Sequence, residues 1–407
     1  MSSAVSTSAS FATAVAPRPW LARVLRAAAA RPGVHAALFW LLAVGFCAVF
    51  APLLANSYPI VVKMDGRWSS PMLAHLTRAD VALLGFTFIA VLLVLLRRAM
   101  PRRALVATAG GLSAAVLLAA ALVRPSAVHV YDEYRRAEAL GRVQFILRAP
   151  VPYSPSDYLR DRWNPARPHP QPPSRQHPLG TDRNGGDILS RMIHACRLAM
   201  SIGFVSTGIA LVVGTFIGGL MGYFARWVDL IGMRLVEIFS AMPTTYLLLA
   251  CVAFLKPLVR SETAMVYLFM VIIGLTGWVG YARFTRAEFL KLRSQDFVYA
   301  AIAAGLPMRS VLFRHILPNA VGPLLVGATF GIAGAILSES MISFLGLGLV
   351  DAPSWGQLLS GAVTAFGFRW WLALFPGMAI FLTLFAYNLI GEALRDAIDP
   401  RLWRAMR

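Results

Sequence analysis

The chain has 407 residues, of which 58% are hydrophobic and only 14% are charged, and its formal net charge is +19. Soluble domains usually carry about 25% charged residues, so this deficit indicates that lipid is the main solvent of the chain. A strong positive charge can favour nucleic-acid binding, but the long apolar runs leave no compact basic domain for it. Basic loops between membrane spans explain the charge, so we expect membrane lipid and no nucleic acid among the partners.

Apolar runs long enough to cross a membrane recur along the chain. A spanning helix needs about 20 apolar residues at a rise of 1.5 Å each. The sequence therefore predicts an all-α fold, a polytopic membrane helix bundle of about eight transmembrane helices. The predicted spans are 34–54, 79–96, 104–123, 198–224, 229–255, 264–282, 319–349 and 372–394.

The first apolar run follows a basic stretch, which is also the pattern of a cleaved signal peptide. The run is too long for the core of a typical signal peptide, so we expect residues 1–33 to be a retained cytoplasmic tail and 34–55 to be the first transmembrane helix.

Arginine placement predicts the orientation of the spans. Four arginines, Arg97, Arg98, Arg102 and Arg103, fall in one short turn, which is typical of a cytoplasmic loop. This turn lies within an apolar hairpin, 79–123. With that hairpin in place, both termini, including the tail 396–407, are expected in the cytoplasm. Residues 56–78 and 124–196 are then periplasmic; the second stretch is rich in arginine, but long loops cross the membrane largely regardless of charge.

The stretch before the fourth span combines turn residues with a short amphipathic pattern. Prolines between 164 and 173 predict extended chain. Asp182, Asn184 and Asp187 lack the spacing of a calcium loop and favour turn-and-cap chemistry, with Asp187 at a helix start. The residues after Asp187 predict a short helix lying at the membrane surface before the span. The three cysteines, Cys47, Cys196 and Cys251, form no metal-binding or disulfide pattern.

The most informative stretch is the basic segment 283–318, which is too long for a simple connector. Apolar and small residues recur at helical spacing up to Ala304, and Gly305 ends that helix. A second short helix, 308–316, is expected to end at Pro318, where the chain turns back into the membrane. Such an elbow can dock on another protein, although a basic cytoplasmic loop needs no special explanation.

The elbow resembles the EAA loop of binding-protein-dependent ABC transporter permeases, which forms the coupling helix that sits on the ATPase subunit. Tyr299 stands where the family often has Glu. The residues that match the family pattern, and that the resemblance assigns to ATPase coupling, are Ala300, Ala301, Gly305, His315, Leu317 and Pro318.

Further motifs place the resemblance in the oligopeptide/dipeptide C-type branch, across residues 179–401. They are Leu-Gly-Thr-Asp at 179–182 with Gly-Asp-Ile-Leu-Ser-Arg at 186–191, Glu-Ile-Phe-Ser-Ala-Met-Pro at 237–243, Ser-Phe-Leu-Gly-Leu-Gly at 343–348, Pro-Ser-Trp-Gly at 353–356 and Asp-Ala-Ile-Asp-Pro-Arg at 396–401. Residues 58–68, 172–176 and 286–290 resemble the microcin C-type peptide permease subgroup more narrowly. The hairpin 79–123 departs from the six-span family pattern and is expected to be a peripheral packing element.

The resemblance implies a type I ABC importer permease core at 197–395 that moves peptides by alternating access. It implies four kinds of partner: a B-type permease that completes a heterodimer, one or more cytoplasmic ATPase subunits, a periplasmic peptide-binding protein and lipid. No P-loop is present, so no cofactor is expected on this chain, and the ATPase partner uses ATP and Mg²⁺. The protein is then a bacterial inner-membrane transport subunit, not an enzyme.

Polar residues inside the predicted spans are candidates for the translocation pathway, because charges in lipid are costly and often functional. They are Glu237 and the cluster Ser338, Glu339 and Ser340. Pro243 is a further candidate, because it is expected to kink its helix. Packing roles remain an alternative for both glutamates. Two other functions also stay open: import of a non-peptide solute such as nickel, and ion-coupled secondary transport, although neither a repeat nor an acidic cluster favours the second.

Overall fold

The computed structural model describes residue 29 and residues 31–398, with gaps at 98, 124–129, 163–168, 260, 349–351, 365–366 and 368. Most of the predicted tails 1–33 and 396–407, and half of the proline-rich run, lie outside these residues. The elements of the first half are α2 (Pro32–Leu54), β1 (Val61–Met64), β2 (Arg67–Ser69), α3 (Pro71–Ala74), α4 (Arg78–Leu96), α5 (Arg102–Leu122), α6 (Glu133–Ala139), β3 (Val143–Leu147) and η1 (Arg160–Arg162).

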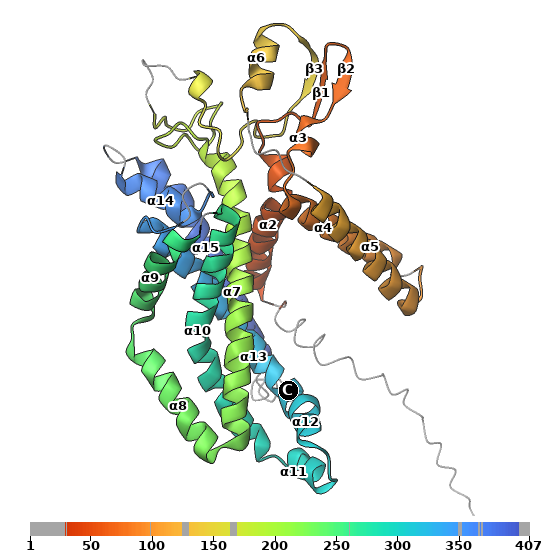
Figure 1. Cartoon of the computed structure of the whole chain (residues 1–407), viewed down its shortest axis with the longest axis vertical. Helices are drawn as coiled ribbons and strands as arrows, with labels where there is room; N and C mark the ends of the chain where they lie inside the picture. The colour runs from red at the N-terminus through yellow and green to blue at the C-terminus, as the bar shows by residue number, and fades with distance from the viewer. Residues whose placement is uncertain are drawn as a thin grey trace, which may run out of the picture.

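The second half of the chain is almost wholly helical. Its elements are α7 (Ile188–Phe224), α8 (Arg226–Ala241), α9 (Thr244–Leu255), η2 (Lys256–Leu258), α10 (Glu262–Arg293), α11 (Asp296–Ala303), α12 (Met308–Ser310), η3 (Val311–Ile316), α13 (Leu317–Phe344), α14 (Trp355–Thr364) and α15 (Trp370–Ile398). Figure 1 shows the long helices α2, α7, α10, α13 and α15 side by side in one elongated bundle.

The centre of the bundle is the contact between α7 and α10, which pack on each other more extensively than any other pair of elements. Three glycines one turn apart on α7, namely Gly214, Gly218 and Gly222, let the two backbones approach. A Cβ atom on Gly218 would lie 2.3 Å from the carbonyl oxygen of Ala282 on α10. Small residues at such spacing bring membrane helices together, because lipid gives no hydrophobic driving force between them.

Among the described residues, seven helices are long and apolar enough to cross a membrane, and a bent pair, α8 with α9, raises the number to eight. The expected all-α membrane bundle of about eight spans is therefore confirmed. At Pro243, where a kink was expected, the helix is broken. α8 ends at Ala241, α9 begins at Thr244, and the two helix axes differ by 79°.

Three predicted boundaries are wrong. The helix expected to lie at the membrane surface is the first part of α7, which runs unbroken for 37 residues because no breaker separates it from the span. The span predicted to end at residue 282 continues as α10 to Arg293. Pro318 does not turn the chain: it lies in the first turn of α13, where its missing N–H is no loss, and 308–344 is one helical rod.

One end of the bundle carries a small cap built from residues 56–76, 130–162 and 169–187. Its three-stranded antiparallel sheet has the order β2-β1-β3, an element that the all-α prediction did not include. Arg135 pairs with Asp157 and Asp161, each at 2.7 Å. Burial lowers the pKa of Arg135, but hydrogen bonds to the two carboxylates outweigh it and raise the pKa above its usual value. The ion pairs thus tie α6 to the segment that follows β3.

The helices α4 and α5 form the predicted apolar hairpin, which leans away from the bundle (Figure 1). Few residues of either helix are buried within the chain. Asp80 closes a capping box with Thr77 at the start of α4 and also pairs with Arg197 of α7. Because Arg197 donates at 3.0 Å to the carbonyl oxygen of Ala48 on α2, this arginine joins the hairpin to two bundle helices.

Candidate coupling and translocation sites

The elbow predicted for docking lies at the end of the bundle opposite the cap (Figure 1). We define it as residues 294–310, which comprise α11, a turn and α12. Ala301 is buried against Val298 and Ile316 at the base of the elbow, whereas Ala300 faces outward. The alanine pair therefore has two roles, one packing against the bundle and one on the exposed surface.

Gly305 ends α11 in a left-handed conformation, with φ of +74°. The amide of Gly305 donates to the carbonyl of Ile302 at 2.9 Å, and the amide of Leu306 donates to that of Ala301 at 3.2 Å. These two bonds form a Schellman motif, which favours glycine at this position. A Cβ on Gly305 would meet nothing within 4 Å in this chain, so conformation, not close packing inside the chain, explains the glycine here.

The surface of the elbow is apolar and exposed. Large hydrophobic side chains with 39–59% of their surface exposed gather there: Phe297, Tyr299, Ile302, Leu306 and Met308. Exposed apolar patches of this kind mark contact surfaces for other proteins or for a membrane.

His315, Leu317 and Pro318 follow the elbow and do not belong to its exposed apolar surface. The ring Nδ1 of His315 lies 3.0 Å from the carbonyl oxygen of Ser310, five residues earlier, and stabilises the π-helical turn η3. Leu317 packs against the cluster at the base of the elbow, and Pro318 starts α13. These three residues position the elbow on the end of the bundle.

The break between α8 and α9 lies about midway along the bundle (Figure 1). Glu237 on α8 is half-exposed and pairs with Arg234 at 2.6 Å, and the residues around Pro243 are exposed. Charged side chains and interrupted backbone at membrane depth are tolerated only against protein or water. The exposed ion pair and the interrupted backbone of this broken span are therefore candidates for contact with another protein or with water.

A cavity of about 220 Å³ opens between α7, α9, α10 and α13. Its polar lining consists of hydroxyl groups, those of Ser206, Thr207, Thr244, Thr276, Tyr281 and Ser338. The buried hydroxyls of Ser206 and Thr207 have no hydrogen-bond partner among the described residues. The structure thus brings Ser338 and the residue after Pro243 to one site, whereas Glu237 does not line it.

Glu339 and Ser340 are buried, with 2% and 4% of their surface exposed. The carboxylate of Glu339 accepts hydrogen bonds from Ser343 at 2.6 Å and from Ser354 at 2.7 Å. Ser354 lies just before α14, so Glu339 fixes the connection between α13 and α14. This geometry favours the packing role over the pathway role for Glu339.

The Pro-Ser-Trp-Gly motif at 353–356 is explained by the same junction. The indole of Trp355 donates to the carbonyl of Met192 on α7 at 3.3 Å. Gly356 lies against the end of α13, where a Cβ would be 2.1 Å from the carbonyl oxygen of Ser340. The motif was recognisable in the sequence, but its partners on α7 and α13 were not.

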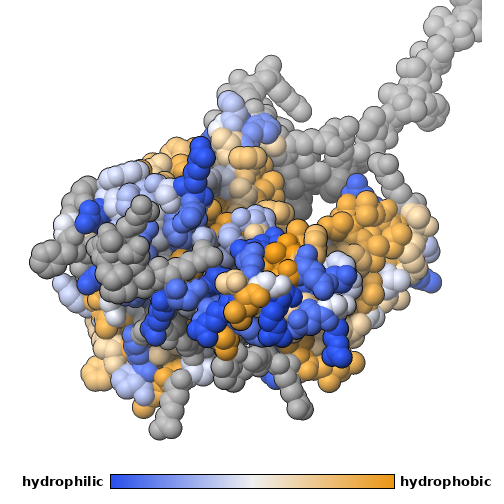
Figure 2. Space-filling model, turned by 90° about the horizontal axis from the view of Figure 1, so that it is seen from above, coloured by the Kyte–Doolittle hydropathy of each residue, from blue (hydrophilic) through white to orange (hydrophobic). Residues whose placement is uncertain are grey.

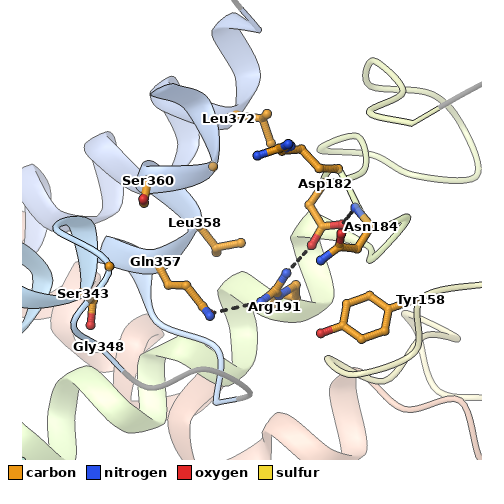
Figure 3. Close-up of a pocket in the computed structure, with 13 residues that line it drawn as sticks. Tyr158, Asp182, Asn184, Arg191, Ser343, Gly348, Gln357, Leu358, Ser360 and Leu372 are labelled. Carbon is orange, nitrogen blue, oxygen red and sulfur yellow. Dashed lines mark hydrogen bonds and ion pairs between the residues drawn. The ribbon is translucent and has the colours of Figure 1, made fainter. Parts of the chain in front are cut away.

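A second cavity, which we call the outer pocket, lies at the cap end and has a volume of about 330 Å³. Figure 3 shows Asp182 and Gln357 reaching Arg191 from two different sides. Residues of α14 and the turn after α13 form the facing wall. Sequence reasoning included this arginine in a family motif but assigned it no role, because an arginine between apolar residues at a helix start also fits a membrane interface.

Asp182 and Asp187 have the turn and cap roles expected of them. Asp182 accepts the backbone amides of Asn184 and Gly186 at 2.9 and 2.8 Å. Asp187 accepts the amide of Ser190 at 2.8 Å and caps α7. These bonds hold the loop that carries Asp182 against Arg191.

Comparison with known proteins identifies the family of the chain. The family described as "Binding-protein-dependent transport system inner membrane component" matches residues 214–404. The "Dipeptide transport system permease protein DppC" of Alkalihalophilus pseudofirmus is 37% identical over 57% of this chain and 74% of its own length. The "Oligopeptide transport system permease protein OppC" of Haemophilus influenzae is 38% identical over 55% of this chain and 70% of its own.

A third relative is similar over more of the chain. The "Inner membrane ABC transporter permease protein YejE" of Escherichia coli is 31% identical over 86% of this chain and 87% of its own length. A solved structure of the MetNI methionine ABC transporter in an inward-facing conformation aligns with 50% of this chain at 18% identity and a TM-score of 0.40.

These three relatives are each more than 30% identical to the chain, and the matched region covers more than two thirds of the length of each relative. This similarity decides the family. As a member of their family the protein is a multi-pass bacterial membrane permease that works with an ATPase and a binding protein. The chain belongs to the binding-protein-dependent ABC transporter permeases, in the oligopeptide and dipeptide branch.

Proposed function

We propose that this chain is an inner-membrane permease subunit that imports peptides into the cytoplasm, in the manner of the microcin C-type peptide permeases. Several of its relatives are named as dipeptide or oligopeptide permeases. A binding protein delivers the peptide at the cap, and this chain pairs with a B-type permease to enclose the passage. Both termini lie in the cytoplasm.

The observation that carries the proposal is the elbow at 294–310. Its exposed apolar surface is flanked by basic residues, Lys291 and Arg293 at the end of α10 and Arg309 and Arg314 after the turn. Positive charge favours a cytoplasmic location for this end, where an ATPase subunit can cover the apolar side chains. The ATPase uses ATP and Mg²⁺, and this chain binds no cofactor and hydrolyses nothing itself.

The opposite end suits a partner in the periplasm. Figure 2, seen from the cap end, shows hydrophilic residues gathered over the centre and hydrophobic ones around the rim. The exposed Glu237 of α8, the break before α9 and the hydroxyl-lined cavity lie between the two ends. Closure of the ATPase dimer moves the elbow, and the helices that carry it open the passage alternately to each side.

Ser338 and the break at Pro243 are the residues that we assign to the passage, because they border the hydroxyl-lined cavity. Hydroxyl groups without charge can hydrogen-bond to the backbone of any peptide, which suits a passage of low selectivity. Glu237 does not line this cavity, and we assign it to the passage through its exposed position on α8 before the break.

The test is ATP-dependent uptake of a labelled peptide mixture into proteoliposomes. They contain this chain, the neighbouring permease, the ATPase and the binding protein. Uptake that requires every component supports the proposal. If the binding protein stimulates ATP hydrolysis but no peptide is taken up, the peptide substrate is wrong. If the ATPase does not associate with the chain, the role of the elbow is wrong and ion-coupled transport is favoured.

A further inference from the structure

The outer pocket lies away from both the elbow and the hydroxyl-lined cavity. Its walls come from four parts of the chain: the segment before η1 with Tyr158, the loop before α7 with the first turn of α7, the end of α13 with α14, and the start of α15. The backbone of the pocket contributes glycines, among them Gly346 and Gly361, around which a Cβ would meet nothing within 4 Å. Open space is therefore available beside the polar wall shown in Figure 3.

Arg191 is the charged group at the centre of this wall, and its side chain is only 8% exposed. Its guanidinium donates to Asp182 and, at 3.1 Å, to Oε1 of Gln357. An arginine has five N–H groups, so these two bonds leave donor capacity unused. The Nε atom has no hydrogen-bond partner in the part of the chain that the structure describes.

The pocket offers more donors than free acceptors. The carboxylate of Asp182 already accepts two backbone amides besides the guanidinium. Arg183, which is exposed, and the side-chain amide of Asn184 add further donors to the lining. With two arginines and one carboxylate the lining carries a net positive charge, and the group that complements it is an anion with several acceptor oxygens.

We propose that the outer pocket binds the C-terminal carboxylate of a peptide, a proposal that rests on the proposed peptide import. A carboxylate fits the planar donor fork of an arginine, which favours such groups over neutral ones. The volume of about 330 Å³ is at the lower end of small-molecule sites, so it holds the terminal residues of a peptide but not a long one. Asp182 and Gln357 position the guanidinium before the peptide arrives.

The experiment compares two peptides on the assembled complex of this chain, the neighbouring permease and the ATPase in lipid nanodiscs, without the binding protein. The probes are N-terminally labelled tri-alanine and its C-terminal amide, and fluorescence anisotropy gives the Kd of each. Hydrogen bonds to charged groups are worth enough to predict about a tenfold or larger weakening for the amide. Equal Kd values for the two peptides would overturn the proposal without any mutation.

Three variants test the residues. Arg191→Gln is expected to weaken the binding of the free acid to the level of the amide. Gly361→Leu, which fills open space without removing a polar contact, is expected to weaken binding of the acid as well. Arg175→Gln is the matched control, because Arg175 is exposed on the same outer segment but does not line the pocket.

Two outcomes separate the sources of failure. If Arg191→Gln weakens binding of the peptide-binding protein while the ratio of the two tri-alanine Kd values stays unchanged, the pocket receives an acidic side chain of that protein and the proposal is wrong. If the complete system imports the acid and the amide equally well and both bind alike, peptide import stands and only the pocket proposal fails.

Discussion

Gly305 offers a direct test of the elbow, because its contribution is conformational. Replacing it with alanine puts a Cβ on a residue with φ of +74° but into open space. A left-handed conformation costs an L-residue about 1–2 kcal/mol, and no clash within this chain adds to it. This energy corresponds to roughly a 5- to 30-fold shift in the population of the native turn.

The expected result is a loss of coupling, not of folding. ATP hydrolysis by the assembled complex, stimulated by the peptide-loaded binding protein, is expected to fall in the order Gly305, Gly305→Asn, Gly305→Ala, because asparagine tolerates this conformation better than alanine. Gly305→Arg is expected to be the least active, since it adds a long charged side chain to the exposed apolar surface. Protein levels in the membrane are expected to stay unchanged.

The control is Gly280→Ala in α10, where a Cβ also meets nothing within 4 Å and φ is not positive. This variant is expected to keep full coupling. Equal losses for Gly305→Asn and Gly305→Ala would show that side-chain volume against the ATPase, not backbone strain, is what matters. Normal stimulated hydrolysis in Gly305→Arg would refute the coupling role of the elbow.

Three further perturbations test the bundle. Gly218→Ala places a Cβ 2.3 Å from a backbone oxygen of α10 and is expected to destabilise the protein by about 1–3 kcal/mol, measured by thermal unfolding in detergent. The control Gly208→Ala lies on the same helix, where a Cβ meets nothing within 4 Å, and is expected to be neutral or stabilising. Glu339→Ala removes the acceptor of the Ser343 and Ser354 hydroxyls and is expected to lower the free energy of unfolding by about 2–5 kcal/mol in the same assay, with a smaller loss for Glu339→Gln. An unchanged melting temperature for the alanine variant would contradict the packing role. Asp80→Ala leaves Arg197 without its carboxylate, and losing one partner of such an ion pair costs about 3–5 kcal/mol. Disulfide cross-linking between cysteines placed on α2 and α4 is therefore expected to decrease strongly. The control Asp132→Ala breaks a pair with the exposed Arg136 and is expected to change the cross-linking little.

The helical bundle could be predicted from the sequence because apolar runs of spanning length are a local property. Each predicted span overlaps a helix of the structure, and the family was recognised from motifs that are contiguous in the chain. The errors fell at boundaries. No breaker separates 188–197 from the span that follows, and Pro318 is compatible with the first turn of a helix, so neither position ends one.

The roles of single polar residues could not be predicted in the same way. Glu237 and Glu339 look alike in the sequence, as acidic residues within apolar runs. One is half-exposed beside an arginine on its own helix, and the other is enclosed by hydroxyls, one of them 15 residues further along. Which environment a carboxylate meets depends on how the helices pack, and a single sequence does not contain that packing.

The sequence by itself determined that this chain crosses a membrane many times and that its relatives are ABC permeases, and it predicted a helical docking elbow within 283–318. Only the tertiary structure decided that Gly305 ends a helix in a left-handed turn, that the broken span borders a hydroxyl-lined cavity, and that Asp182, Arg191 and Gln357 meet in one pocket. The physical reason is range: hydrophobic runs and helix breakers act over a few residues, whereas Arg191 and Gln357 are 166 residues apart and meet only after α7 and α14 have packed.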